Sequence, residues 1–144
     1  MANISIVTLG VDDLAAATEF YVKMGWTNTT SSQESVTFLQ GDSIVLGLYG
    51  RSALAEDAQV ADTPSGFRGS ALALNVASEG DVDAYFQQAL AAGGQKIKQP
   101  EKVFWGGYSG YFADLDGHLW EVAHNPFFQG DSKTGQLKLE GVQP

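Results

Sequence analysis

Apolar residues along the chain follow a strand period and a helix period, and this order of elements occurs twice. Residues 4–11 are rich in β-branched side chains and predict a strand, and Asp12 or Asp13 then offers a helix N-cap. Apolar residues next recur at helical spacing until Gly25, which ends that helix. Three short strands are predicted after it, at residues 26–30, 35–39 and 44–49. The first half therefore predicts the order β-α-β-β-β.

The second half predicts the same order. Residues 71–76 alternate as a strand, residues 78–81 can cap an amphipathic helix, and the glycine pair at 93–94 stops it. Residues 95–103 predict a short strand and a loop. Residues 110–124 predict two strands joined by an acidic turn, because Asp-Gly between apolar runs favours a hairpin.

The two halves also match residue by residue. Val7, Leu9 and Val11 correspond to Leu72, Leu74 and Val76 at a constant offset of 65, as does the Phe20-Tyr21 pair to Tyr85-Phe86, and Phe38 is matched to Phe112. Chance matching of apolar residues is the alternative, but shared offsets together with a shared order of elements favour a duplicated module. We therefore predict an α+β fold made of two β-α-β-β-β modules.

The boundaries of the domain and of its two modules follow from this duplication. We predict one domain over residues 1–127, made of a module at 1–50, a connector at 51–69 with a helical turn near 52–57, and a module at 70–127. A polar tail at 128–144 completes the chain, in which 136–139 can form a short edge strand.

Composition narrows the possible functions. The 144 residues carry a formal charge of −9, no cysteine and two histidines. The charge argues against nucleic acid as a partner, and the lack of cysteine removes disulfides and thiolate metal sites. The N-terminal residues lack the basic and apolar segments of a signal peptide, and no stretch predicts a membrane span. We expect a cytoplasmic protein that does not associate with a membrane.

One carboxylate, Glu121, lies in the middle of an apolar strand at 119–123. Side chains alternate across a strand, so Glu121 faces away from Trp120 and Val122. An unpaired buried carboxylate is costly, and Glu121 therefore needs a role. It can be a structural group satisfied by a neighbouring donor, the anchor of a cationic or hydrogen-bonding ligand, or a general base with a raised pKa. The sequence shows no partner that would stabilise an oxyanion beside it.

Two aromatic segments are further candidates. Trp105 and Tyr108 flank a glycine pair, and their rings can stack on a ligand or fill the core. The adjacent Phe127 and Phe128 can cover a pocket mouth or form a dimer contact.

The two histidines are not expected to form a site together with Glu121. His118 and His124 each lie three residues from it, and an odd separation on a strand points side chains to opposite faces. We expect His118 to be a turn residue and His124 a strand-end residue.

The hairpin motif at residues 114–121, Asp-Leu-Asp-Gly-His-Leu-Trp-Glu, resembles the vicinal oxygen chelate superfamily. The resemblance begins at the Val-Asp-Asp-Leu junction of residues 11–14 and covers nearly the whole chain, with Leu115 where the family usually has proline. This superfamily includes glyoxalase I, extradiol dioxygenases and the fosfomycin- and bleomycin-resistance proteins. The resemblance implies a cup of curved mixed sheet with helices outside, a pocket on the concave face and frequent dimers.

The resemblance also implies four metal-ligand positions. They fall on Ile6, Ala71, Leu46 or Gly47, and Glu121, and only Glu121 has a donor side chain. We therefore expect no metal and no other cofactor.

These observations predict a metal-independent protein that binds a small aromatic or cationic ligand, with sequestration of that ligand as its expected role. Trp105, Tyr108 and Glu121 are the predicted ligand-binding residues, with a homodimer as the predicted assembly. The alternative is a glyoxalase-like lyase, an isomerase or a dioxygenase that uses Glu121 as ligand or base. A third hypothesis is a dimeric interaction module with no small ligand.

Overall fold

The computed structural model describes residues 3–63, 66–128, 136–137 and 139. The elements of the first module are β1 (Ile6–Val11), α1 (Leu14–Lys23), β2 (Thr27–Asn28), β3 (Val36–Gln40) and β4 (Val45–Gly50). The connector contains α2 (Arg51–Asp57). The second module contains β5 (Leu72–Asn75), α3 (Glu79–Ala91), β6 (Gln95–Lys102), β7 (Tyr108–Ala113) and β8 (Leu119–His124). The predicted order of elements is confirmed in both halves.

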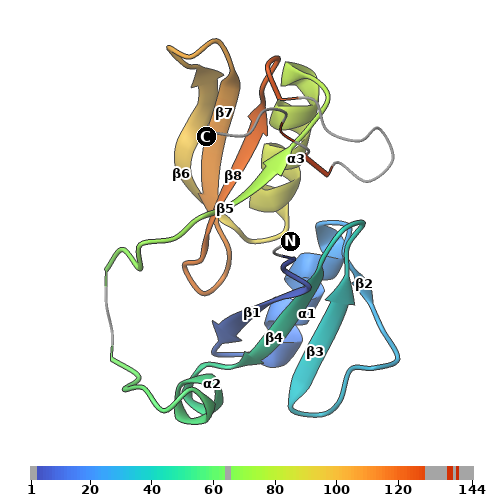
Figure 1. The fold of residues 1–144 in the computed structure, drawn as a ribbon, viewed down its shortest axis with the longest axis vertical. Coiled ribbons are helices and arrows are strands. Elements are labelled where there is room, and N and C mark those ends of the chain that lie inside the picture. The colour runs from blue at the N-terminus through green and yellow to red at the C-terminus, as the bar shows by residue number, and fades with distance from the viewer. Residues whose placement is uncertain (1–2, 64–65, 129–135, 138, 140–144) are drawn as a thin grey trace, which may run out of the picture.

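The two modules have the same topology (Figure 1). The sheet orders are β1-β4-β3-β2 and β5-β8-β7-β6, with one parallel pair in each sheet, β1 with β4 and β5 with β8. β1 and β5 are therefore edge strands, and no ladder joins the two sheets within the described residues. The α+β class and the duplicated module are as predicted.

Capping residues define the two long helices. The side chain of Asp13 accepts a hydrogen bond from the Ala16 N–H, and Ser78 accepts one from the Asp81 N–H, so both predicted caps are present. Gly25 and Gly93 follow the helices with φ of 99° and 109°, backbone angles that residues with a side chain rarely adopt.

The core lies on the face of each sheet that meets the helices. In β1 and β4 the inward side chains are those of Val7, Leu9, Leu46 and Leu48, and in β8 they are Trp120 and Val122. Phe20 and Tyr21 of α1, and Met24 directly after it, belong to the same buried cluster as Trp120. The core is therefore shared between the modules through side chains.

A buried polar network crosses the boundary between the modules. The Tyr21 hydroxyl donates to Asp114 Oδ2 at 2.5 Å and accepts from Trp120 Nε1 at 3.0 Å. The other oxygen of Asp114 accepts from the N–H groups of Asp116 and His118 at 2.9 and 2.8 Å. One carboxylate thus shapes the β7–β8 turn and binds α1 of the other module.

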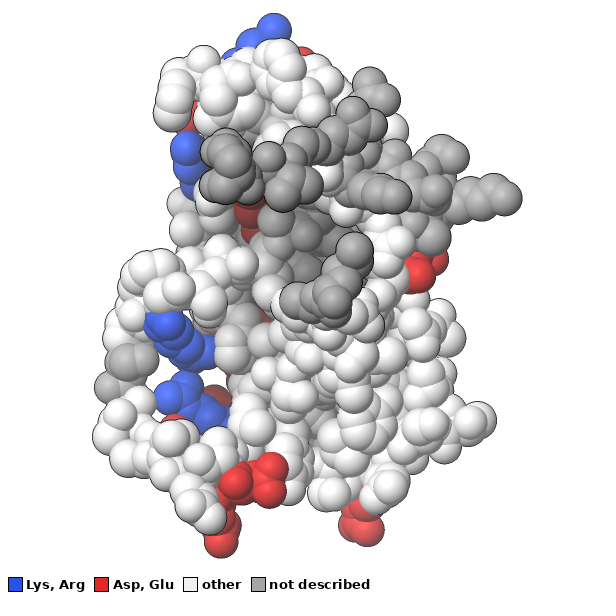
Figure 2. Space-filling model, in the orientation of Figure 1, with Lys and Arg blue, Asp and Glu red and all other residues white. Residues whose placement is uncertain are grey.

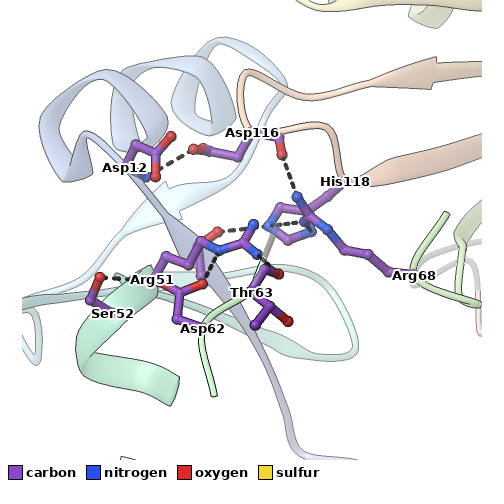
Figure 3. Close-up of polar contacts among 9 residues, drawn as sticks. Asp12, Arg51, Ser52, Asp62, Thr63, Arg68, Asp116 and His118 are labelled. Carbon is purple, nitrogen blue, oxygen red and sulfur yellow. Dashed lines mark hydrogen bonds and ion pairs between the residues drawn. The ribbon is translucent and has the colours of Figure 1, made fainter. Parts of the chain in front are cut away.

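The connector is fastened at both ends, beside a hollow flanked by basic groups (Figure 2). Arg51 donates to Asp62 at 2.6 Å and to the Thr63 carbonyl at 3.2 Å, and this interaction lowers the pKa of Asp62. Arg68 lies 2.9 Å from His118 Nδ1 and donates to the Asp116 carbonyl (Figure 3). The connector therefore ends against the β7–β8 turn.

Three sequence predictions need correction or lie partly outside the described residues. Residues 95–102 form a full strand, β6, with two register shifts, where a short strand and loop was predicted. Phe38 pairs with Gly47 on the face away from the helices, so its counterpart is Tyr111, which pairs with Glu121, and the match to Phe112 was wrong by one residue. Of the predicted strand at 136–139 only an isolated bridge at Leu137 is described. Among the described residues no helix is long and apolar enough to cross a membrane.

We predict a loss of stability at alkaline pH. Burial raises the pKa of Tyr85 to about 12, and burial followed by the Asp114 carboxylate raises that of Tyr21 further. Because the folded state holds these protons more tightly, the stabilisation is complete below pH 10 and is lost as the pH rises. The free energy of unfolding should fall by about 1.4 kcal/mol per pH unit for each tyrosine above pH 10. Urea titrations between pH 9 and 12 measure this slope, and Tyr85→Phe should reduce it; an unchanged slope would contradict the assignment.

Candidate functional site

The face of the second sheet that points away from α3 carries a carboxylate and a phenol side by side. The register places Glu121 of β8 between Ala73 of β5 and Tyr111 of β7, and all three side chains lie on this face. Trp120 and Val122 point to the core, as the alternation predicted. Glu121 is half-buried and Ala73 is exposed. A carboxylate and a phenol therefore lie next to each other on this face of the sheet.

Tyr111 is the partner of Glu121. Burial raises the pKa of Tyr111, and the charge of Glu121 and a hydrogen bond to it raise the pKa further. At neutral pH Tyr111 is therefore a neutral phenol that can donate to the carboxylate. The register continues to Lys98 of β6, whose Nζ lies 3.5 Å from Glu101.

The first module has no comparable pair. Thr8, Gly47 and Phe38 occupy the positions that Ala73, Glu121 and Tyr111 occupy in the second module. A Cβ at Gly47 would lie 3.1 Å from Thr8 Oγ1 and 3.6 Å from Ile6 Cγ2. Gly47 therefore faces the same side as Ile6, whereas Leu46 is buried in the core. This settles which of the two corresponds to Glu121.

The residues at the family's four ligand positions do not fit a metal ion. Ile6, Ala71 and Gly47 offer no donor atom, which leaves Glu121 as the one side-chain donor of the four. No group of three or more histidine, aspartate or glutamate side chains is arranged to hold a metal in the part of the chain that the structure describes.

The structure does not bring Tyr108 and Glu121 together. Tyr108 pairs with His124, packs against the core and donates to Asp83 of α3 at 2.7 Å. Trp105 lies in the β6–β7 turn, where its ring covers the Gly107 backbone so closely that any Cβ there would lie 1.7 Å from Cζ3. Trp105 is 36% exposed. The two aromatic residues predicted to stack on a ligand thus belong to different surroundings.

Both histidines bond to groups other than Glu121. His118 Nε2 lies 2.7 Å from the Gly10 carbonyl and its Nδ1 faces Arg68. His124 Nδ1 lies 3.1 Å from the Val76 carbonyl. Both therefore join segments of backbone.

Exposed aromatic side chains gather near the β6–β7 turn. Phe104, Phe127 and Phe128 are 102%, 72% and 43% exposed, and Phe127 lies against Gly106, where a Cβ would be 3.1 Å away from its ring. A dimer contact through Phe127 and Phe128 stays a prediction.

Comparison with known proteins gives the family. Residues 3–122 match the model of the Glyoxalase/Bleomycin resistance protein/Dioxygenase superfamily. The chain belongs to this superfamily. A structure of a glyoxalase-related enzyme from Fulvimarina pelagi is 33% identical, covers 98% of this chain and 100% of its own, and superposes with a TM-score of 0.85. This confirms the resemblance read from residues 114–121.

Further similarities are more distant. A family enzyme from Burkholderia phytofirmans is 24% identical over 85% of this chain and 98% of its own, with a TM-score of 0.77. An uncharacterized protein of Mycobacterium bovis, Mb0911c, is 29% identical and covers 79% of this chain and 78% of its own.

Sequence reasoning missed Tyr111 as the partner of Glu121. The available signal was the length of the turn: Ala113 pairs with Leu119, so each step back from the turn on β7 meets one step forward on β8. Counting two steps reaches Tyr111 and Glu121. The Asp-Gly motif indicated a hairpin, but a two-residue turn is shorter than the loop that this superfamily member has.

Proposed function

We propose that this superfamily member binds a small aromatic or cationic molecule on the Glu121 face without a metal. The observation that carries the proposal is the Glu121–Tyr111 pair, with the exposed Ala73 on the other side of Glu121. A carboxylate supported by a phenol can accept hydrogen bonds from an ammonium, amidine or amide group. Half-burial of Glu121 strengthens such a bond relative to one in bulk water.

The surroundings limit what such a ligand can be. Ala73 and Ala71 are exposed small residues on the β5 side of Glu121, so these positions leave space beside the carboxylate. The Tyr111 ring lies on the other side of Glu121. A ligand with a flat ring and one positively charged or donor group matches these features. Sequestration is the simplest role of such a protein.

A proton-transfer enzyme is the second candidate, and the same pair favours it. Glu121 can accept a proton from a carbon acid while the neutral phenol of Tyr111 donates a hydrogen bond to the developing oxyanion. This supplies the partner that the sequence did not reveal. The relative from Fulvimarina pelagi is described as a glyoxalase-related enzyme, which is consistent with this alternative.

Calorimetric titration with aromatic amines such as benzylamine and tryptamine tests the proposal. We expect Glu121→Gln to weaken binding by about tenfold to a hundredfold, since a charged hydrogen bond contributes about 1.5–3 kcal/mol. Glu19→Gln, the same change on the exposed face of α1, is the control and should bind as the wild type does.

Two results would contradict metal-free binding at this face. One is equal affinity of the wild type and Glu121→Gln for every amine bound. The other is a stoichiometric metal ion, found by elemental analysis of the purified protein, that is lost in Glu121→Gln. Turnover of a carbon acid by the metal-free protein, lost in Tyr111→Phe, would favour the enzyme instead.

A further inference from the structure

A cavity lies between the modules, on the helix side of the sheets. Its volume is about 640 Å³, within the range of small-molecule pockets. Three aromatic residues line it, Trp26 after α1, Tyr85 of α3 and Trp120 of β8. Aliphatic side chains of Val7 and Leu46 complete its apolar wall. This wall is therefore built from both modules.

The intermodule pocket is separate from the Glu121 face. Val7, Leu46 and Trp120 belong to the helix-side core, and alternation along β8 puts the side chains of Trp120 and Glu121 on opposite faces of the sheet. Glu121 and Tyr111 are absent from its lining in the described part of the chain. A molecule in this pocket would not touch the carboxylate.

The edge of β5 that faces away from β8 carries backbone hydrogen-bonding groups. The Val76 N–H donates to the Ala123 carbonyl at 2.8 Å, which fixes the even-numbered residues as those that bond to β8. Because the direction alternates along a strand, the N–H and C=O groups of Ala73 and Asn75 point to the other edge. Both residues line the pocket. Gln136 and Leu137 of the C-terminal segment line the pocket as well, and Leu137 forms an isolated bridge.

The aromatic wall is held in place by a glycine. Trp26 packs on the Gly41 backbone, where a Cβ would lie 2.6 Å from Cζ3 of the indole. Trp26 and Trp120 have ring centroids 6.2 Å apart and are inclined by 64°. The two indoles thus contact each other edge to face, and with Tyr85 they form the aromatic wall of the pocket.

The polar rim gives the charge preference of the pocket. Gln40, Asp42 and Ser43 of the β3–β4 turn lie at its mouth. No lysine, arginine or histidine is part of the lining formed by the described residues. Nothing there neutralises an anion, and Asp42 would repel one.

We propose that the intermodule pocket is a second binding site, which takes a neutral aromatic molecule that packs against the wall formed by Trp26 and Tyr85. This site is independent of the proposed function of the Glu121 face.

The neutral dye N-phenyl-1-naphthylamine tests this site because its fluorescence rises in apolar surroundings and it accepts energy from tryptophan. We expect saturable binding with quenching of tryptophan emission. Ser43→Phe, which narrows the mouth, should weaken binding at least tenfold, whereas Ser31→Phe on an exposed loop should not. Glu121→Gln should bind the dye normally, which separates this site from the first.

Three outcomes would overturn the proposal. The first is the absence of saturable dye binding to the full chain. If a chain that ends at residue 128 binds the dye and the full chain does not, the C-terminal tail, of which Gln136 and Leu137 line the pocket, would be its occupant instead of a ligand. Equal affinity of Ser43→Phe and Ser31→Phe is the second. The third is binding lost in Phe104→Ser, which would assign the dye to the exposed aromatic residues near the β6–β7 turn.

Discussion

Replacing Asp114 with alanine should lower the free energy of unfolding by about 3–5 kcal/mol, measured by urea titration at pH 7. Asp114 is 5% exposed and accepts hydrogen bonds from Tyr21 and from two backbone N–H groups of its own turn. The alanine variant leaves the buried Tyr21 hydroxyl without its acceptor and removes the group that closes the turn. Loss of the acceptor therefore weakens both the β7–β8 hairpin and its contact with α1.

A double-mutant cycle with Tyr21→Phe isolates the bond between the modules. The cycle should give a coupling energy of about 1.5–3 kcal/mol, as expected of a hydrogen bond to a charged group. Asp62→Ala is the matched control: it removes an aspartate whose partner is Arg51 on the surface, and it should cost less than about 1 kcal/mol. Equal losses in Asp114→Ala and Asp62→Ala would contradict the role given to Asp114.

Trp120→Ala should cost about 3–5 kcal/mol and should affect both modules. Its ring stacks on Phe112 at 3° between planes and 6.4 Å between centroids. It also meets Tyr21 and Trp26 of the other module, at 5.9 and 6.2 Å. A cavity at this position therefore removes packing within the second module and between the modules.

Scanning calorimetry distinguishes the two parts of that loss. We expect the unfolding transition of Trp120→Ala to broaden or divide, because the modules share less core. Trp105→Ala removes the same side chain from a turn where it is 36% exposed, and it should shift the midpoint only slightly. A wild-type midpoint in Trp120→Ala would show that the modules do not depend on this ring.

Much of the fold followed from local patterns. Asp13 and Ser78 cap helices because their side chains accept from N–H groups of the first turn, and this is decided within four residues. The offset of 65 held because Val7 and Leu72 both face the core. Periodicity records which face is buried, and such features need no knowledge of the partner strand.

Features that depend on how the strands pair were harder to predict from the sequence. Tyr111 meets Glu121 only because the five residues between Ala113 and Leu119 set the register. The same dependence moved the counterpart of Phe38 from Phe112 to Tyr111. Tyr108 donates to Asp83 because of its position in β7. The aromatic, glycine-rich sequence around Tyr108 had instead suggested a contact with a ligand. Register is fixed by turns, and a shift of one residue exchanges the faces.

The edge positions of β1 and β5 have a consequence for motion. Because no described ladder joins the sheets, the modules can part as rigid bodies while every strand pair stays intact. Among the described hydrogen bonds, one backbone N–H is donated across the boundary, that of Asp12 to Asp116 at 2.8 Å. Hinge opening about the connector would thus leave nearly all amides protected from exchange with solvent and would be visible chiefly at Asp12.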